Sequence, residues 1–303
     1  MATEFITFDR LTMVAPLGLR FHDASSGSLV SDGLVVWAHP VGKPTARRQA
    51  IGNRKGVYVL QHGYGLREIE HGEGSNSYWH DPGPPKKDFV IEVSDSQRRF
   101  QSFQFTASVP TEGIYKWDAP LASPFDGRTT IPLFSSPVRT VPSGMAAIRA
   151  DLWDTSINAP AAWAMIEVFT AGKFLGSGIA DEKGRIAVIF PYPAPLPFAT
   201  ASPLGSPLGS PVVATSPPLT EQVWPLELRA LYTPARPPAP DLRFTLSQPA
   251  ATLWADAEQT EILEDANLRF GLELILKSRP PLASPLSSVR GSVLFITPAV
   301  SPP

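Results

Sequence analysis

Proline is the feature that most constrains how this chain can fold. It contributes 34 of the 303 residues, about twice the ~5 % share that is usual in proteins. A proline inside a helix removes a backbone donor and clashes with the preceding turn, so long helices cannot accommodate many of them. We therefore expect neither a helical bundle nor a doubly wound α/β enzyme. The chain suits short strands that are joined by long turns.

Four short blocks recur in the same order along the chain, which indicates a diverged internal duplication. Their offsets are 131, 128, 135 and 139 residues (23 to 154, 53 to 181, 89 to 224, 105 to 244). This drift is what insertions in surface loops produce. The matching segments are 21–27 with 152–158, 53–60 with 181–188, 89–93 with 224–228, and 105–110 with 244–249.

The blocks carry the chemistry of turns and strands. The shared pattern of Asp, then Ser, then Gly or Asn is typical of turns, because short side chains bond nearby backbone donors. Asn or Asp followed by x-Lys-Gly and an apolar run predicts a hairpin turn that enters a strand. Alternating apolar residues over 268–277 predict one continuous strand, with 292–297 as its partner.

This pattern predicts an all-β protein of two duplicated antiparallel β-sandwich domains, over residues 1–140 and 141–303. Each copy carries a long insertion at the equivalent place. The insertion 61–88 is rich in Gly, His and aromatic residues. The insertion 191–223 is rich in Pro, and it carries no charged residue from 191 to 220. Loops on a rigid scaffold often carry binding function. The connector 135–145 contains two prolines, which predicts a short and stiff link.

The order of turns and strands resembles the carboxypeptidase-regulatory-like, or transthyretin-like, family of β-sandwich modules. The residues that carry the resemblance are 23–27, 33–36 and 53–60 in the first copy, and 154–158, 165–169 and 181–188 in the second. The resemblance covers about half of each copy and implies a fold. The family usually has a Thr-Asp pair before the glycine turn, where this chain has Gly52-Asn53 and Ala180-Asp181.

Charge and motifs argue against several function classes. The 28 acidic and 26 basic residues give a net charge of -2, which does not favour nucleic-acid binding. The absence of cysteine excludes disulfides, thiolate metal sites and a cysteine nucleophile. The chain contains no phosphate loop, no complete dinucleotide fingerprint and no nucleophile elbow. We therefore expect no enzyme activity, no catalytic residues and no cofactor. The sequence shows no targeting or membrane segment, so we expect a cytoplasmic protein without membrane insertion.

The insertion 61–88 holds the candidate contact residues. Its aromatic and imidazole side chains could form a sugar platform or a protein contact, or they could hold the loop onto its own domain. Three histidines share the segment with carboxylates, which could ligate zinc. No short-spaced histidine pair occurs, so we expect no metal site. The candidate contact residues are Tyr64, His71, Tyr78, Trp79 and His80.

The remaining tryptophans in strand-like blocks are assigned to the cores; they are Trp37, Trp153, Trp163, Trp224 and Trp254.

These observations predict a non-enzymatic structural or adaptor protein whose partners are other protein subunits of a multi-copy assembly. Sandwich edges can accept a strand from a partner, which suits assembly. The plan of the whole chain is similar to that of accessory proteins of phage-tail-like contractile injection systems, which implies a cap, tube-sheath or baseplate role. The alternative is a carbohydrate- or small-ligand-binding module that uses the insertion 61–88. A hydrolase assembled from residues distant in sequence is a third hypothesis.

Overall fold

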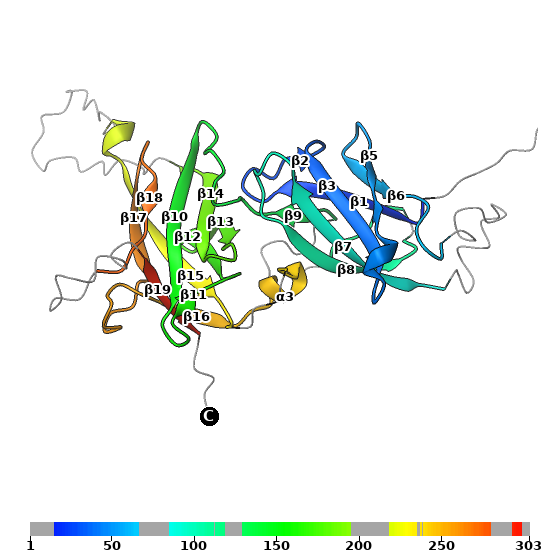
Figure 1. The fold of residues 1–303 in the computed structure, drawn as a ribbon. Helices are drawn as coiled ribbons and strands as arrows, with labels where there is room; N and C mark the ends of the chain where they lie inside the picture. The colour runs from blue at the N-terminus through cyan, green and yellow to red at the C-terminus, as the bar shows by residue number, and fades with distance from the viewer. Residues whose placement is uncertain are drawn as a thin grey trace, which may run out of the picture.

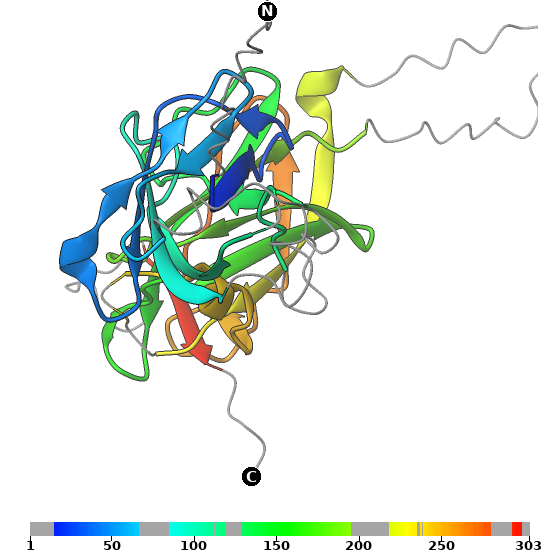
Figure 2. The same ribbon diagram turned by 90° about the vertical axis from the view of Figure 1, so that its right-hand side faces the viewer.

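The computed structural model describes residues 15–66, 85–111, 113–118, 129–194, 218–234, 237, 239–279 and 293–298. These residues form two β-sandwiches that lie side by side (Figure 1). Viewed from the side of the first sandwich, one sandwich lies behind the other (Figure 2). Within the described residues, helix is limited to α3 (Leu242–Leu246) and the short 3-10 turns η1 (Pro44–Ala46) and η2 (Leu219–Glu221). The prediction of an all-β fold is confirmed.

The first sandwich consists of a sheet in the order β4-β3-β7-β8 and a sheet in the order β2-β1-β6-β5, in which β9 also pairs with β1. All of these pairings are antiparallel except β1 with β9. The strands are β1 (Leu17–Asp23), β2 (Leu29–Val30), β3 (Leu34–Pro40), β4 (Arg48–Gln49), β5 (Ile51–Gly52), β6 (Val57–Leu60), β7 (Lys87–Asp95), β8 (Phe103–Val109) and β9 (Ile131–Leu133).

The second sandwich is built on the path β11-β10-β19-β16-β15-β12-β13, with β14 and β18 beside β10 and β17 beside β15. Its parallel pairings are β10 with β18 and β10 with β19. The strands are β10 (Met145–Asp154), β11 (Ala159–Pro160), β12 (Met165–Thr170), β13 (Lys173–Ile179), β14 (Arg185–Pro191), β15 (Val223–Leu231), β16 (Ala250–Trp254), β17 (Asp265–Arg269), β18 (Leu274–Ile275) and β19 (Leu294–Pro298).

The two sandwiches pair their first strands in the same order and register. β1 pairs antiparallel with β6 and parallel with β9, and β10 pairs in the same two ways with β14 and β19. Asp23 lies opposite Leu133 in the first sandwich, and Asp154 lies opposite Ile296 in the second. β3 pairs with β7 as β12 pairs with β15. The insertions that the sequence indicates therefore join equivalent strands, β6 to β7 and β14 to β15.

The same turn follows β1 and β10. The Asp23 carboxylate accepts from the backbone N–H of Ser25 at 2.9 Å and from its hydroxyl at 2.6 Å. The Asp154 carboxylate accepts from the corresponding groups of Ser156 at 2.8 and 2.6 Å. These bonds satisfy backbone donors that the strand ladder leaves free, as Asp-Ser turns do elsewhere.

A second pair of equivalent turns precedes β6 and β14. The side-chain oxygens of Asn53 and Asp181 each accept from the backbone N–H groups two and four residues further on, at 2.9 to 3.0 Å. Gly56 and Gly184 close the two turns with φ angles of 72° and 76°, a region in which L side chains are strained. The glycine is therefore a requirement of the turn.

Two sequence predictions about the second sandwich are wrong. The segment 268–277 is not one strand: β17 ends at Arg269, a turn at Gly271 (φ 75°) follows, and Leu272 is 59 % exposed. The expected partner strand, β19, pairs with β10 and β16 instead. The match of 105–110 with 244–249 also fails, because β8 is a strand and α3 is a helix capped by Asp241, whose side chain accepts from Phe244 N–H at 2.9 Å.

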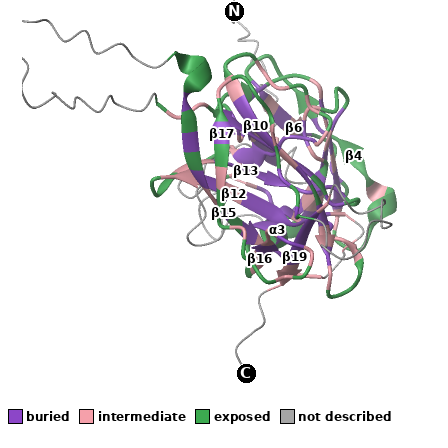
Figure 3. Ribbon diagram, turned by 90° about the vertical axis from the view of Figure 1, so that its left-hand side faces the viewer, coloured by how far each residue is buried: buried purple, intermediate pink, exposed green. Residues whose placement is uncertain are grey.

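Most of the buried apolar side chains fall into two clusters, one in each sandwich. Figure 3 shows this burial along the strands of the second sandwich, with exposed residues in the loops. The second cluster is built from β10, β12, β14 and β15 together with parts of the later strands. The first cluster differs, because four residues of the second half of the chain also belong to it: Met165, Ile179, Leu242 and Leu246.

No helix of the described residues is long and apolar enough to cross a membrane.

Candidate functional site

The junction between the sandwiches is apolar at its centre. Met165 of β12 and Ile179 of β13 are 1 % and 2 % exposed, yet they belong to the cluster of the first sandwich and not to that of the second. Leu242 of α3, which lies between the two sandwiches in Figure 1, is fully buried in the same cluster. α3 thus packs in the apolar cluster that joins the first sandwich to β12 and β13 of the second. Burial of these side chains stabilises the junction through the hydrophobic effect.

A backbone contact fixes the segment before α3 on the first sandwich. Gln104 of β8 donates its backbone N–H to the Pro240 carbonyl at 2.9 Å, and Gln104 and Asp241 form a parallel bridge. Because this contact is directional, it sets the position of the segment as well as holding it.

The connector is held from both sides by arginines. Arg139 pairs with Asp23 of β1 at 2.7 Å, with side chains only 10 % and 8 % exposed. It also donates to the Ser135 hydroxyl at 3.0 Å. Arg149 of β10 donates to the carbonyls of Pro137 (2.5 Å) and Arg139 (2.8 Å). The connector is therefore hydrogen-bonded to the first strand of each sandwich.

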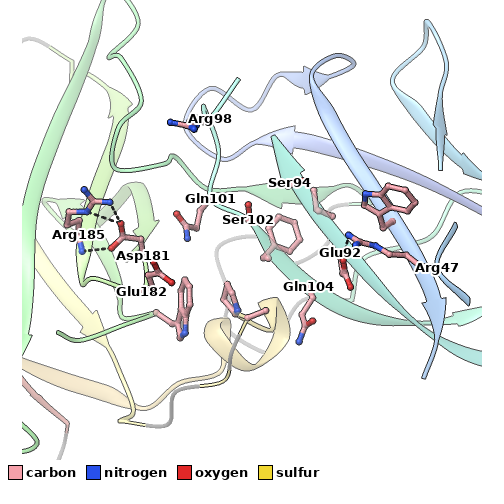
Figure 4. Close-up of a pocket in the computed structure, with 16 residues that line it drawn as sticks. Arg47, Glu92, Ser94, Arg98, Gln101, Ser102, Gln104, Asp181, Glu182 and Arg185 are labelled. Atoms are coloured by element: carbon pink, nitrogen blue, oxygen red, sulfur yellow. Dashed lines mark hydrogen bonds and ion pairs between the residues drawn. The ribbon is translucent and has the colours of Figure 1, made fainter. Parts of the chain in front are cut away.

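A cleft of about 780 Å³ opens beside this junction (Figure 4). One wall is the outer face of β3, β7 and the start of β8, together with Arg47. The opposite wall is the turn at the start of β14 and Trp163, and the Ala239–Pro240 segment completes it. Both sandwiches therefore contribute side chains to one cleft.

On the first wall, charges are paired over a tryptophan. The Arg47 guanidinium lies 4.5 Å from the centre of the Trp37 ring and 2.5 Å from the Glu92 carboxylate. The other Glu92 oxygen lies 3.4 Å from Nε2 of His39. Glu92 thus fixes the guanidinium over the ring, an arrangement that combines an ion pair with a cation–π contact.

On the opposite wall, Asp181 is saturated with donors. Arg185 donates to its carboxylate from Nε at 2.9 Å and from a terminal nitrogen at 2.7 Å, in addition to the two backbone bonds of the turn. The neighbouring Glu182 is exposed and lines the cleft. A carboxylate with four donors is rigid, so this wall is preorganised.

Trp163 is held in an uncommon conformation at the same wall. Its φ angle is 64°, in the left-handed region, which is rare for a bulky residue. Its indole N–H donates to the Pro237 carbonyl at 3.2 Å, and its own carbonyl accepts from the Gln248 amide at 2.9 Å. The side chain is 8 % exposed.

The structure describes one of the five contact residues that the sequence indicates. Tyr64 is 53 % exposed, and the Lys43 ammonium lies 4.7 Å from its ring centre and 3.5 Å from its hydroxyl. The other four, His71, Tyr78, Trp79 and His80, lie outside the described residues. The cleft does not include Tyr64, and no pattern in the sequence predicted it.

The assignment of the tryptophans to cores is partly wrong. Trp163 and Trp224 are buried, whereas Trp37, Trp153 and Trp254 are only half-buried. Trp37 and Trp163 line the cleft instead of a core. Their strand-like neighbours in sequence do not indicate that the two tryptophans line one cleft between two sandwiches.

No group of three or more His, Asp or Glu side chains that could hold a metal ion occurs in the described part of the chain.

The chain has little similarity to known proteins. No family model matches the chain, and no curated protein matches it. Among solved structures, it is similar to the TIE protein of Bacillus anthracis (9 % identity, TM-score 0.22), with 94 % of this chain and 44 % of that chain covered. It is also similar to the shaft pilin SpaA from Lactobacillus rhamnosus GG (8 % identity, TM-score 0.22), with 95 % and 99 % covered. The chain thus spans less than half of the TIE protein. Overlap at these TM-scores carries no argument about fold or function.

Proposed function

We propose that this chain is a non-enzymatic structural component of a protein assembly, in which it serves as one rigid unit of two sandwiches. The observation that carries the proposal is the apolar cluster that extends from the first sandwich through Leu242 to Met165 and Ile179 of the second. Two domains that share a core keep a fixed relative orientation, whereas small polar interfaces permit motion. A structural subunit needs a fixed orientation of its domains, because the position of one neighbour then determines the position of the next.

The chemistry of the cleft supports a role without catalysis. A general acid or base needs a carboxyl or imidazole that can reach a substrate proton. Here Asp181 accepts four hydrogen bonds, and Glu92 is shared between Arg47 and His39. These two carboxylates are therefore committed to holding the walls. Glu182 is the remaining carboxylate among the described residues that line the cleft, and it has no second uncommitted carboxyl or imidazole beside it there.

Within this class, we propose a contractile injection system as the assembly and the cytosol as its compartment. The support is the sequence resemblance and the paired plan of the two sandwiches, in which equivalent strands carry unlike loops. Such a component would place the loops of its two sandwiches against different neighbours.

The experiment is sedimentation of cell extract from the source organism with an epitope-tagged chain at its native locus. We expect the tagged chain to co-sediment with particles that contain sheath and tube proteins, and its gene to lie beside theirs. Leu242→Asp, which breaks the shared core, should abolish incorporation, and Phe244→Asp on the exposed side of the same helix should not. A tagged chain that stays at the top of the gradient as a monomer would contradict the structural role.

A further inference from the structure

We propose that the cleft between the two sandwiches is a binding site for a neutral, polyhydroxylated ligand, and that its ligand class is the oligosaccharide. This inference is independent of the structural role, because a structural component of an assembly can have such a binding site or lack it. It concerns a different place from the insertion 61–88.

The size and position of the cleft suit a small ligand. Its volume of about 780 Å³ falls within the range of roughly 300–1,000 Å³ that is common for ligand sites, and such sites occur preferentially between domains. The shared core and the bonds of the connector fix the distance between its walls. A preformed site loses little entropy when a ligand binds.

The charge of the cleft excludes a strongly ionic ligand. Three arginines and three carboxylates line it, so their charges sum to zero: Arg47, Arg98, Arg185, Glu92, Asp181 and Glu182. A phosphate or sulfate site would instead show an excess of cations. Four of these groups are neutralised within the walls by the pairs Arg47–Glu92 and Arg185–Asp181.

The uncommitted groups of the cleft include both donors and acceptors. All four of these groups line the cleft, and no side-chain hydrogen bond joins them to another described residue: Arg98, Gln101, Gln104 and Glu182. A sugar hydroxyl both donates and accepts, so neighbouring hydroxyls need donors and acceptors placed side by side. Guanidinium, amide and carboxylate groups supply this combination, and Figure 4 shows Gln101, Gln104 and Glu182 around the same opening.

The apolar part of the site comes from two tryptophans. Trp37 and Trp163 lie on opposite walls and contribute apolar surface to the cleft. The Arg47 guanidinium lies over one face of the Trp37 ring and Trp163 is 8 % exposed, so the C–H face of a sugar would pack only on the surface of the two rings that stays uncovered. Backbone in a disfavoured region persists only where the surroundings fix it, and such residues concentrate at functional sites. The left-handed Trp163, fixed through Pro237 and Gln248, is a residue of this kind.

Titration of the full chain with neutral oligosaccharides tests the proposal. The probes are hexasaccharides of glucose, mannose, galactose and N-acetylglucosamine, with sialylated and sulfated oligosaccharides as charged comparisons. Binding is followed by calorimetry and by tryptophan fluorescence. We expect saturable binding of at least one neutral probe and no preference for the charged ones.

Variants locate the binding. Glu182→Gln and Gln104→Ala should each weaken binding by about two- to tenfold, the loss expected for one hydrogen bond. The matched controls Glu258→Gln and Gln97→Ala are exposed and lie outside the cleft, and they should leave affinity unchanged. Urea unfolding verifies that each variant is folded. Absence of binding to every neutral probe, a preference for the charged oligosaccharides, or equal affinity in the cleft and control variants would overturn the proposal.

Discussion

The carboxylate of Asp23 and the guanidinium of Arg139 form a buried ion pair that ties the connector to the first strand of the first sandwich. Two of their contacts are 2.7 and 3.1 Å long. Asp154, which occupies the equivalent position in the second sandwich, accepts instead from the Tyr232 hydroxyl at 2.8 Å. The two turns are alike, but only the first has become part of the junction.

Loss of Arg139 should destabilise the protein strongly. Arg139→Ala leaves the Asp23 carboxylate buried without its partner, a change that typically costs about 3–5 kcal/mol. Arg185→Ala is the matched control, since the Arg185 side chain is 46 % exposed and its pair should contribute at most about 1 kcal/mol. Urea unfolding followed by circular dichroism measures both. Equal losses in the two variants would contradict the role of the buried pair.

The same ion pair predicts a loss of stability in acid. Burial alone raises the pKa of Asp23, but hydrogen bonds from Arg139 and Ser25 and the charge of Arg139 outweigh it and hold the pKa below its usual value. A carboxyl with a lowered pKa in the folded state contributes stability above its unfolded pKa of about 3.9, and that stability is lost as pH falls through the folded pKa. The free energy of unfolding, measured from pH 6 to pH 2, should therefore fall less steeply in Asp23→Asn than in the parent chain. An unchanged slope would argue against this assignment.

Two equivalent glycines should respond differently to alanine. At Gly56 an added Cβ lies 3.4 Å or more from its nearest neighbours, so Gly56→Ala should cost only the roughly 1–2 kcal/mol of a positive φ. At Gly184 the Cβ would collide with the Leu152 carbonyl oxygen. Gly184→Ala should lose at least twice as much stability in the same denaturation assay. A smaller loss at Gly184 than at Gly56 would show that the packing around β14 is looser than described.

The helix α3 should couple the two sandwiches. Leu242 is fully buried and Phe244 is 38 % exposed on the same helix. Leu242→Ala should cost about 2–5 kcal/mol, as other buried leucines do, and Phe244→Ala about 0.5 kcal/mol or less. In calorimetry the parent chain should unfold in one transition, and Leu242→Asp should separate it into two. A parent chain that already unfolds in two independent transitions would contradict the shared core.

Local patterns in the sequence predict the fold class and the equivalent turns, because their causes are local. The proline content excludes long helices, and Asn53 and Asp181 bond to backbone groups within four residues. Hydrophobic alternation predicts β15 equally well, since its buried and exposed residues alternate regularly. Alternation alone fails at 268–277, where Gly271 permits a turn that the apolar period conceals.

The site could not be predicted because its parts are distant in sequence. Trp37, Glu92 and Asp181 meet only after two sandwiches dock, and none of them stands in a motif with ligand spacing. The helix α3 was missed for a related reason. Phe244 and its neighbours match the strand segment 105–110 in composition, but the Asp241 cap and burial of Leu242 at the junction favour a helix.

The most direct test of the rigid two-sandwich unit is a distance distribution between two spin labels, one on each sandwich. The chain contains no cysteine, so Gln49→Cys on β4 and Asn267→Cys on β17, both exposed strand positions, can be labelled without interference. Pulsed electron paramagnetic resonance should give one narrow distribution for the doubly labelled chain and a broad one when Leu242→Asp is added. A broad distribution in the chain with intact Leu242 would contradict the account.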